Sequence, residues 1–379
     1  MANRPMIGLI LAGGGARAAY QAGVMVAVSR ILPDARHNPF PVICGTSAGA
    51  INAAGLACGA VDFRAAAGHL AQIWRQIHIE NVYHADWPTF LKTFLHFGVS
   101  IASGGRFWNN PRSFLDNSPL RQLLTSTMTF EGVERARQAG VLHALALTAS
   151  CYSSGKSVTF FDGHPDIGEW SRQMRVGTRD RIGLDHLMAS SALPLIFPAA
   201  KVGGQYFCDG AVRQMAPLSP ALHLGAEKLF VIGLAGPRPH ERREEVAADY
   251  PPPAQVFGHL LNSVFADSMS SDMERLIRVN HTVSLLRHHE ELASKTPLHR
   301  VEVFMLNPSE SLEEIAMRHL HQFPAVMRFV LQGAGATRMR GLSLATYLLF
   351  EPGYCRDLIA LGYKDALRHR DEIFKFLEL

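Results

Sequence analysis

Short apolar runs that end in glycine-rich turns alternate with segments of helical spacing near the start of the chain. Residues 7–12 are an apolar run that ends at a glycine triplet, and residues 17–32 follow with helical spacing. A second short run at 42–44 precedes a segment of small residues at 48–58. Strands and helices that alternate in this order are typical of an α/β fold with parallel strands. We therefore expect two strand–turn–helix units here.

The rest of the chain carries further strand patterns and one long amphipathic segment. Apolar or alternating runs predict strands at 142–147, 158–161, 205–208, 229–234 and 301–306. Residues 236–253 are rich in charge and proline and are interpreted as a linker. After them, one helical stripe is formed by Val256, Phe257, Leu260, Leu261, Val264, Phe265, Met269, Met273, Leu276 and Ile277. We interpret this stripe as the face of a helix that packs on the core.

Composition places the chain among ordinary globular proteins. Of its 379 residues, 47% are hydrophobic and 18% are charged, which argues against disorder, collagen-like repeats and coiled-coil arrays. Lys and Arg number 37 against 33 Asp and Glu, so we expect no nucleic-acid partner. The five cysteines are far apart and form no CxxC, which predicts neither a disulfide framework nor a zinc ribbon.

Two segments resemble targeting signals and are interpreted otherwise. The apolar part of the N-terminus spans only residues 6–12 before a glycine triplet, so we do not expect a cleaved secretory signal. Residues 42–61 carry no charge, but their glycines and alanines favour a strand, a turn and a helix over a membrane span. We expect a cytoplasmic protein, with peripheral membrane association as a further option.

The motif Gly45-Thr46-Ser47-Ala48-Gly49 lies between a predicted strand and a predicted helix. A serine on such a sharp turn projects its hydroxyl outward, and the two glycines let the strand and the helix pass closely. The helix N-terminus behind the serine favours developing negative charge. The pattern predicts Ser47 as a nucleophile, with Gly45 and Gly49 forming the nucleophile elbow. The alternative is a glycine-rich turn whose serine caps the helix.

A glycine triplet, Gly13-Gly14-Gly15, precedes Arg17 after the first predicted strand. Consecutive glycines present backbone N–H groups at a helix start, where an oxyanion or a phosphate can bind. A dinucleotide-binding fingerprint also fits this loop, but it requires an acidic residue at the end of the second strand. Asp34 precedes that strand, so we favour the oxyanion interpretation.

A third motif, Asp209-Gly210-Ala211, follows the strand-like segment 205–208. An aspartate at the end of a strand, followed by glycine, can turn its carboxylate into a cleft. By itself the motif is typical of an ordinary turn. Its position after the other two motifs makes it a candidate for part of the same site.

In this order the three motifs resemble those of the patatin-like phospholipases, and residues 189–198 resemble the segment that this family carries before its DG motif. The family often has Gly where this chain has Ala18. The resemblance implies an α/β three-layer sandwich with a mostly parallel central sheet. Residues 6–235 would be the catalytic domain. Residues 254–379 would be a mostly helical C-terminal extension with one strand, packed on that domain.

The resemblance also implies a role for each motif. Ser47 would be the nucleophile, and Asp209 would be its partner in a Ser–Asp dyad without histidine. The backbone amides of the glycine triplet 13–15 would form the oxyanion hole, with Arg17 steadying the loop. The enzyme would be a serine lipid acyl hydrolase of the phospholipase A type, acting on phospholipid or another acyl-ester lipid through an acyl-enzyme.

Other functions stay open at this point. One is a soluble carboxylesterase or thioesterase on the same dyad, and another is a lipid-binding protein with an idle site. A Ser–Asp–His triad with His223 or His259 would normally come with an HGGG-type loop, which the chain lacks. Neither a cofactor nor a metal is expected, since the tetrad 288–291 is HHEE and not HExxH. The oligomeric state is open.

Aromatic residues gather in the stretch 74–114, where the strand–helix alternation loosens. The spacing of Phe90-Leu91 and Phe94-Leu95 predicts a helix. One interpretation is that these residues pack in the core. The other is a mobile lid over an acyl channel, with a peripheral membrane contact through residues 87–101.

Overall fold

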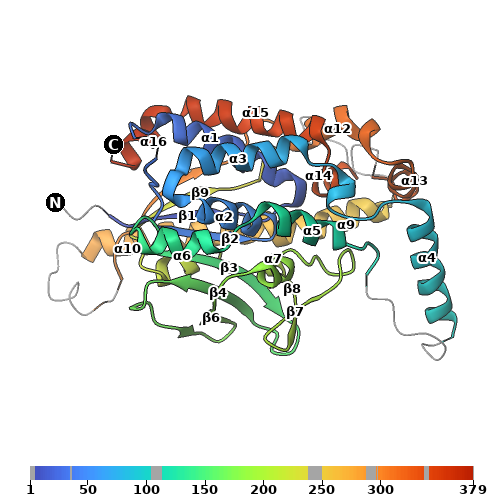
Figure 1. Cartoon of the computed structure of the whole chain (residues 1–379), viewed down its shortest axis with the longest axis horizontal. Helices are drawn as coiled ribbons and strands as arrows, with labels where there is room; N and C mark the ends of the chain where they lie inside the picture. Colours follow the sequence, from blue (N-terminus) through green and yellow to red (C-terminus); the bar gives the residue numbers. More distant parts are fainter. Residues whose placement is uncertain are drawn as a thin grey trace.

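A computed structural model describes residues 5–34, 36–103, 113–237, 250–286, 296, 298–336 and 341–378. In this part of the chain, helices pack against a central sheet (Figure 1). Of the predicted linker, residues 238–249 lie outside the described ranges, as does the HHEE tetrad at 288–291.

The described strands form one sheet whose middle is parallel. They are β1 (Ile7–Leu11), β2 (Val42–Thr46), β3 (Ala144–Cys151), β4 (Ser157–Gly163), β5 (Trp170–Ser171), β6 (Arg175–Arg179), β7 (Ala200–Val202), β8 (Gln205–Asp209), β9 (Lys228–Ile232) and β10 (Glu302–Leu306). Their order is β10-β9-β1-β2-β3-β4-β6-β5, and β8, paired with β7, attaches to β3. From β10 to β3 every pair is parallel, whereas β3 and β4 are antiparallel. The mostly parallel α/β sheet predicted from the sequence is confirmed.

Helices cover both faces of this sheet. In the first two thirds of the chain they are η1 (Gly15–Ala18), α1 (Ala19–Ile31), α2 (Ala48–Cys58), η2 (Ala60–Asp62), α3 (Phe63–Gln76), η3 (Ile79–Asn81), α4 (Trp87–Ala102), α5 (Ser118–Thr127), α6 (Glu131–Gln138), α7 (Leu184–Ser190), η4 (Gly210–Val212) and α8 (Ser219–His223). They continue with α9 (Pro253–Asn262), the π-helical turn η6 (Ser263–Asp267), α10 (Ser268–Leu286), α12 (Leu312–His319), η7 (Leu320–Gln322), α13 (Ala325–Gly333), α14 (Leu342–Leu348), α15 (Pro352–Arg368) and α16 (Arg370–Phe376).

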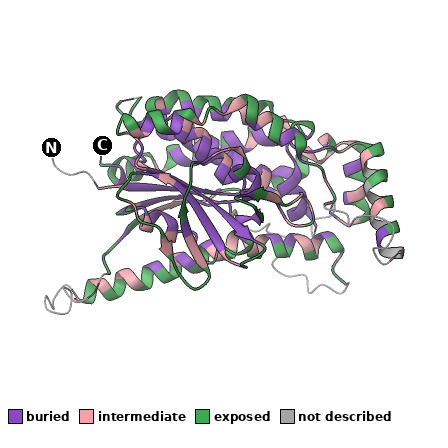
Figure 2. Cartoon of the chain, turned by 60° about the horizontal axis from the view of Figure 1, so that its bottom comes forward, coloured by how far each residue is buried: buried purple, intermediate pink, exposed green. Residues whose placement is uncertain are grey.

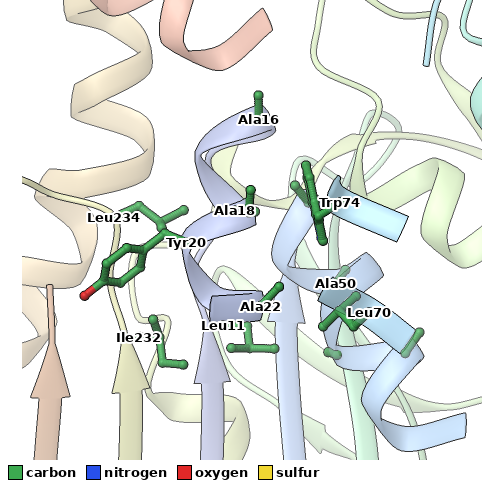
Figure 3. Close-up of a cluster of buried hydrophobic side chains, with 14 of the residues drawn as sticks. Leu11, Ala16, Ala18, Tyr20, Ala22, Ala50, Leu70, Trp74, Ile232 and Leu234 are labelled. Carbon is green, nitrogen blue, oxygen red and sulfur yellow. The ribbon is translucent and has the colours of Figure 1, made fainter. Parts of the chain in front are cut away.

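Strand β1 illustrates why the sheet needs a cover on each face. Successive side chains of a strand point to opposite faces. Leu9 and Leu11 belong to one buried cluster with α1, α2 and α3, whereas Ile10 belongs to a second cluster with α8 and α10. Figure 2 shows the buried strands between the helical layers, and Figure 3 shows Leu11 beside Ala22 and Ala50 on the first face. Helices on both faces make the predicted three-layer arrangement.

The C-terminal part of the chain joins both the sheet and a helical layer. Strand β10 extends the sheet by pairing with β9, and α15 lies along α1 (Figure 1). The buried Tyr20 hydroxyl of α1 donates a hydrogen bond to Asp365 Oδ2 of α15 at 3.2 Å. The division into domains at 6–235 and 254–379 stays a prediction.

The amphipathic segment after residue 253 is not one continuous stripe. The turn η6 separates α9 from α10, and its wider π geometry changes the helical phase. Phe265 and Met269 are buried, whereas Val256, Leu260 and Ile277 are 46%, 55% and 59% exposed. The prediction that the whole stripe packs on the core was wrong for these three residues.

The other predicted elements agree with the structure within a few residues. Each of the five further predicted strands is present, as β3, β4, β8, β9 and β10. Strands β5, β6 and β7 were not predicted, because they are short and carry little apolar pattern. Residues 42–61 form mainly β2 and α2, as expected. None of the described helices combines the length and the apolar character that crossing a membrane would require.

Candidate active site

Strand β3 brings the ends of β2 and β8 together. Thr46 at the end of β2 pairs with Thr148, and Asp209 at the end of β8 pairs with Ala149, the next residue of β3. Because β4 occupies the opposite edge of β3 along this stretch, β2 and β8 share one edge. Ser47 directly follows Thr46. Two motifs far apart in the sequence therefore become neighbours through the register of a third strand.

Ser47 lies on a strained turn between β2 and α2. Its φ of 58° and ψ of −130° are values that a residue with a side chain rarely adopts, and such strain is concentrated at functional sites. The turn is possible because Gly45 and Gly49 have no side chain. A Cβ on Gly45 would overlap the carbonyl oxygen of Gly49, and one on Gly49 would overlap that of Leu11. This is the geometry that the GxSxG spacing predicts.

A second serine holds this turn in place. The backbone N–H of Ser47 donates to Ser190 Oγ at 2.9 Å, and the Ser190 hydroxyl donates to the Thr148 carbonyl at 2.7 Å. Ser190 is fully buried. The segment 189–198 carries a family resemblance in the sequence, but no role for Ser190 was predicted from it. Ser190 connects the Ser47 turn to the strand that positions Asp209.

Asp209 is a buried carboxyl group with one unsatisfied oxygen. Its Oδ1 accepts a hydrogen bond from the Ala211 N–H at 3.0 Å, within the DGA motif. Its Oδ2 is buried and has no hydrogen-bond partner among the described residues. Burial raises the pKa of Asp209 to about 7, while the nearby Ser47 hydroxyl and the Ala211 N–H act in the opposite direction. A carboxyl with this pKa can exchange a proton near neutral pH.

The glycine triplet lies directly beside Ser47. A Cβ placed on Gly13 would be 3.0 Å from the Cβ of Ser47. Gly15 has a φ of 55° and approaches the carbonyl oxygen of Tyr347 too closely for any side chain. In the part of the chain that the structure describes, the amides of Gly13 and Gly14 donate no hydrogen bond. These N–H groups are available to an oxyanion.

Arg17 fixes this loop to the C-terminal part of the chain. Its Nε donates to Thr346 Oγ1 at 2.6 Å, and its terminal nitrogens contact Ser343, Tyr347 and Glu313. The Arg17 side chain is only 5% exposed. A supporting role for Arg17 was predicted from the sequence, but these partners were not. Ser343, Thr346 and Tyr347 lie on one face of the apolar segment 342–348, a signal that could have found them.

An apolar cavity of about 670 Å³ opens beside Ser47 and Asp209. Ser47, Asp209 and Gly15 are among its lining residues. Helices α2, α3 and α5 supply a large share of the wall, and later segments add Phe265, Tyr347, Leu348 and Phe350. A cavity of this size and character suits one or more hydrocarbon chains.

Neither histidine considered for a triad lines this cavity. His223 stacks on Trp170 with ring centroids 4.7 Å apart, and burial together with Arg172 and Arg175 lowers its pKa. His259 lies on the exposed side of α9. Among the described residues, the cavity-lining histidine is His69 of α3, which is exposed. Ser47 and Asp209 thus line one cavity, and neither His223 nor His259 lines it with them.

The aromatic stretch 74–114 divides between core and surface. Trp74 and Tyr83 are buried. Helix α4 stands at the edge of the molecule (Figure 1), and Trp87, Leu91 and Leu95 on it are 50%, 55% and 53% exposed. The side chains of Phe90, Phe94, Phe107 and Trp108 lie outside the described part of the chain. Neither the core interpretation nor the lid interpretation therefore applies to the whole stretch.

Comparison with known proteins identifies a family. The family model described as "Patatin-like phospholipase" matches residues 9–222, more than half of the chain. A curated relative, the "cGAMP-activated phospholipase" of Pseudomonas aeruginosa, is 29% identical over 226 residues. That match covers 57% of this chain and 55% of the relative, so the chain aligns with about half of the relative's length.

Two solved structures show weaker likeness. VipD from Legionella pneumophila matches 98% of this chain and 67% of its own length, with 11% identity and a TM-score of 0.36. The complex of SpcU with ExoU from the type III secretion system of Pseudomonas aeruginosa matches 91% of this chain and 77% of the solved chain. Its identity is 15% and its TM-score is 0.26. Scores this low define no shared fold, and the α/β architecture described above stands on this chain alone.

Proposed function

This chain belongs to the patatin-like phospholipase family, and we propose that it is a serine lipid acyl hydrolase with Ser47 as nucleophile and Asp209 as its base. One observation carries this proposal. A serine on a strained strand-to-helix turn and a buried carboxyl with an unsatisfied oxygen line the same apolar cavity. This is the set of groups that acyl transfer to a serine requires.

The proposed reaction proceeds through an acyl-enzyme. Asp209 accepts the Ser47 proton as the hydroxyl oxygen attacks the ester carbonyl. The free amides of Gly13 and Gly14, together with that of Gly15, stabilise the tetrahedral oxyanion. The alcohol leaves with a proton returned from Asp209, and the acyl group stays on Ser47. Water then attacks this ester as Asp209 accepts its proton. The bond to Ser47 Oγ breaks, Asp209 returns the proton to Ser47, and the fatty acid is released.

The cavity favours a substrate with a long acyl chain. Its wall is built from apolar side chains such as Leu70, Trp74 and Leu124. Burying each methylene of a chain contributes about 0.8 kcal/mol. We therefore place a fatty-acyl chain of a phospholipid or another acyl-ester lipid here. A soluble carboxylesterase or thioesterase on the same dyad would show little gain in rate with chain length.

Labelling with a fluorophosphonate probe tests the proposal directly. Wild type should be labelled on Ser47, as peptide mapping would show, and Ser47→Ala should lose both the label and the hydrolysis of long-chain esters. The relative is described as cGAMP-activated, so each assay is run with and without cGAMP. Folded wild type that stays unlabelled in both conditions would favour a lipid-binding protein with an idle site.

We also propose that α4 contacts the lipid surface. Trp87, Leu91, Leu95 and Val99 are exposed at four-residue spacing, which forms one apolar stripe along the helix. The helix contains no acidic residue. Such a stripe is suited to an interface between water and lipid.

Replacing part of this stripe separates lipid contact from chemistry. Leu91→Gln with Leu95→Gln should lower activity on vesicles several-fold and leave hydrolysis of a soluble short ester unchanged. Leu285→Gln, which removes an exposed leucine of α10, is the control. Equal losses on both substrates would contradict the proposed contact.

A further inference from the structure

A second cavity, of about 230 Å³, lies among three segments that are distant in the sequence. The turn of the β5–β6 hairpin forms one wall, the loop after η4 forms another, and α10 closes it with Arg275. Besides these three segments, the neighbouring strand β4 contributes Ser157 and Thr159 to its lining residues. None of its lining residues lines the cavity beside Ser47. The two cavities are therefore separate sites.

Four arginines from these three segments converge on this cavity. They are Arg172, Arg175, Arg213 and Arg275, and no acidic residue is among the described lining residues. Only Arg275 has an ion-pair partner in the described part of the chain, a contact with Asp272 at 3.8 Å. Like charges gathered in one cavity repel each other, so the arrangement gains stability when an anion occupies it.

Arg175 and Asp272 show that the positive charge of this cavity is only partly neutralised. The Arg175 Nε is buried and has no hydrogen-bond partner among the described residues, which is costly for a charged donor. Asp272 is buried and is committed to the Leu218 N–H at 3.0 Å, so it offsets only part of the positive charge. The described part of the protein therefore supplies no acceptor for the Arg175 Nε–H, and a bound anion could accept this hydrogen bond.

The neutral residues around the arginines are also suited to an anion with several oxygens. The Ser157 hydroxyl adds a hydrogen-bond donor, and the Gln214 amide, one N–H of which donates to Thr148, carries a second N–H. The cavity is smaller than the roughly 300–1,000 Å³ typical of drug-sized ligands. Its size fits a phosphate group with a small substituent, and arginine recognises phosphate with two parallel hydrogen bonds.

We infer that this arginine pocket is a binding site for a phosphate group, either on a soluble metabolite or on the headgroup of a lipid. The site is connected to the proposed nucleophile turn. Gln214 lines the pocket, and it accepts a hydrogen bond from the hydroxyl of Thr46, the residue before Ser47, at 2.7 Å. The Gln214 amide also donates to Thr148 Oγ1 at 3.2 Å.

Calorimetric titration of the full chain with inorganic phosphate at constant ionic strength tests the site. Wild type should bind phosphate saturably, and the pair Arg172→Gln with Arg213→Gln should bind at least about ten-fold more weakly. Both side chains are exposed, so folding is expected to be preserved, and circular dichroism checks this. Arg328→Gln with Arg370→Gln makes the same change in charge at exposed positions elsewhere and should bind like wild type.

Two further arms identify the source of the phosphate. Glycerol 3-phosphate represents a soluble ligand, and phosphatidylcholine vesicles with or without phosphatidic acid represent a lipid surface. If the test pair weakens binding of glycerol 3-phosphate or of the vesicles, that result supports the site and shows which source of phosphate it binds. If the test pair and the control pair behave alike in every arm, the pocket binds no phosphate specifically and the inference is overturned. These readouts do not depend on hydrolysis, so they stand apart from the proposed enzymatic function.

Discussion

The guanidinium carbon of Arg17 lies 4.0 Å from the centre of the Tyr347 ring. One residue belongs to the proposed oxyanion loop and the other to α14, near the far end of the chain. The Tyr347 carbonyl also packs against Gly15, and the Tyr347 side chain lines the cavity. The C-terminal segment therefore forms part of the wall and the support of the candidate site.

Removing the Arg17 charge should damage both stability and reactivity. Arg17→Met leaves Glu313 and the hydroxyl of Thr346 without their buried partner, which costs about 3–5 kcal/mol. Thermal unfolding should show a large decrease in Tm, and fluorophosphonate labelling of the folded fraction should slow. Arg30→Met, which removes an exposed contact with Tyr363, is the control. An Arg17 variant with normal Tm and labelling would contradict a supporting role.

Ser190 should act on Ser47 through the backbone. Ser190→Ala leaves the Ser47 N–H and the Thr148 carbonyl without a buried partner, a cost of about 1–3 kcal/mol. We expect slower labelling of Ser47, by roughly ten-fold, in addition to lower stability. Ser29→Ala is the matched control, because Ser29 is also buried but its hydroxyl donates only to the Val26 carbonyl of its own helix. If both changes slow the labelling equally, Ser190 does not position Ser47.

Activity should depend on pH through Asp209. The proposed base works only when it is ionised, and burial raises its pKa to about 7. Hydrolysis of a soluble ester should therefore rise as the pH passes through about 7 and level off above it. The pH profile of kcat/KM on that ester measures this directly. A profile that is flat between pH 5 and pH 8 would exclude Asp209 as the base with this pKa.

The same shift predicts an opposite dependence for stability. The folded-state pKa of Asp209 lies above the unfolded value of about 3.9, so the folded chain binds this proton more tightly. The contribution of this group to stability is therefore lost as the pH rises from about 4 through about 7. Asp209→Asn keeps the bond from the Ala211 N–H and should be more stable than wild type above pH 7, by on the order of 2–4 kcal/mol.

Denaturant unfolding at pH 5 and pH 8 distinguishes this linkage from a general effect. The advantage of Asp209→Asn should shrink at pH 5, and activity should be lost at both values. Asp86→Asn, at an exposed carboxyl whose pKa is lowered by hydrogen bonds from Thr89, should show no gain at pH 8. An Asp209→Asn variant that is less stable than wild type at pH 8 would contradict the raised pKa.

Gly55 offers a way to shorten the acyl cavity. It lines the cavity from α2, and a Cβ there would make ordinary contacts, 3.6 Å from Leu70 Cδ1 and 3.9 Å from Met128 Cε. Gly55→Leu should fold normally, since leucine is the better helix former. Its rate on long-chain esters should fall about ten-fold or more, while short esters are little affected. Gly68→Leu on the outer face of α3 is the matched control, and identical chain-length profiles would show that acyl chains lie elsewhere.

The local elements on which the site is built can be predicted from the residues of each segment alone. Apolar runs followed by glycine-rich turns fixed β1, β2 and the start of α2, because a sharp turn beside a buried strand tolerates few residue types. The same glycines marked the Ser47 turn and the loop before Arg17. These features are local, so residues close together in the sequence are enough to predict them.

Which distant residues meet depends on the three-dimensional packing of the whole chain. The pairing of β2 and β8 along one edge of β3 brings Ser47 to Asp209, and strand register is invisible in a single sequence. The buried partners of Arg17 and the Ser190 bridge depend on contacts between segments far apart in the chain. The arginine pocket likewise exists only where three such segments converge, because packing, and not local propensity, places their charges together.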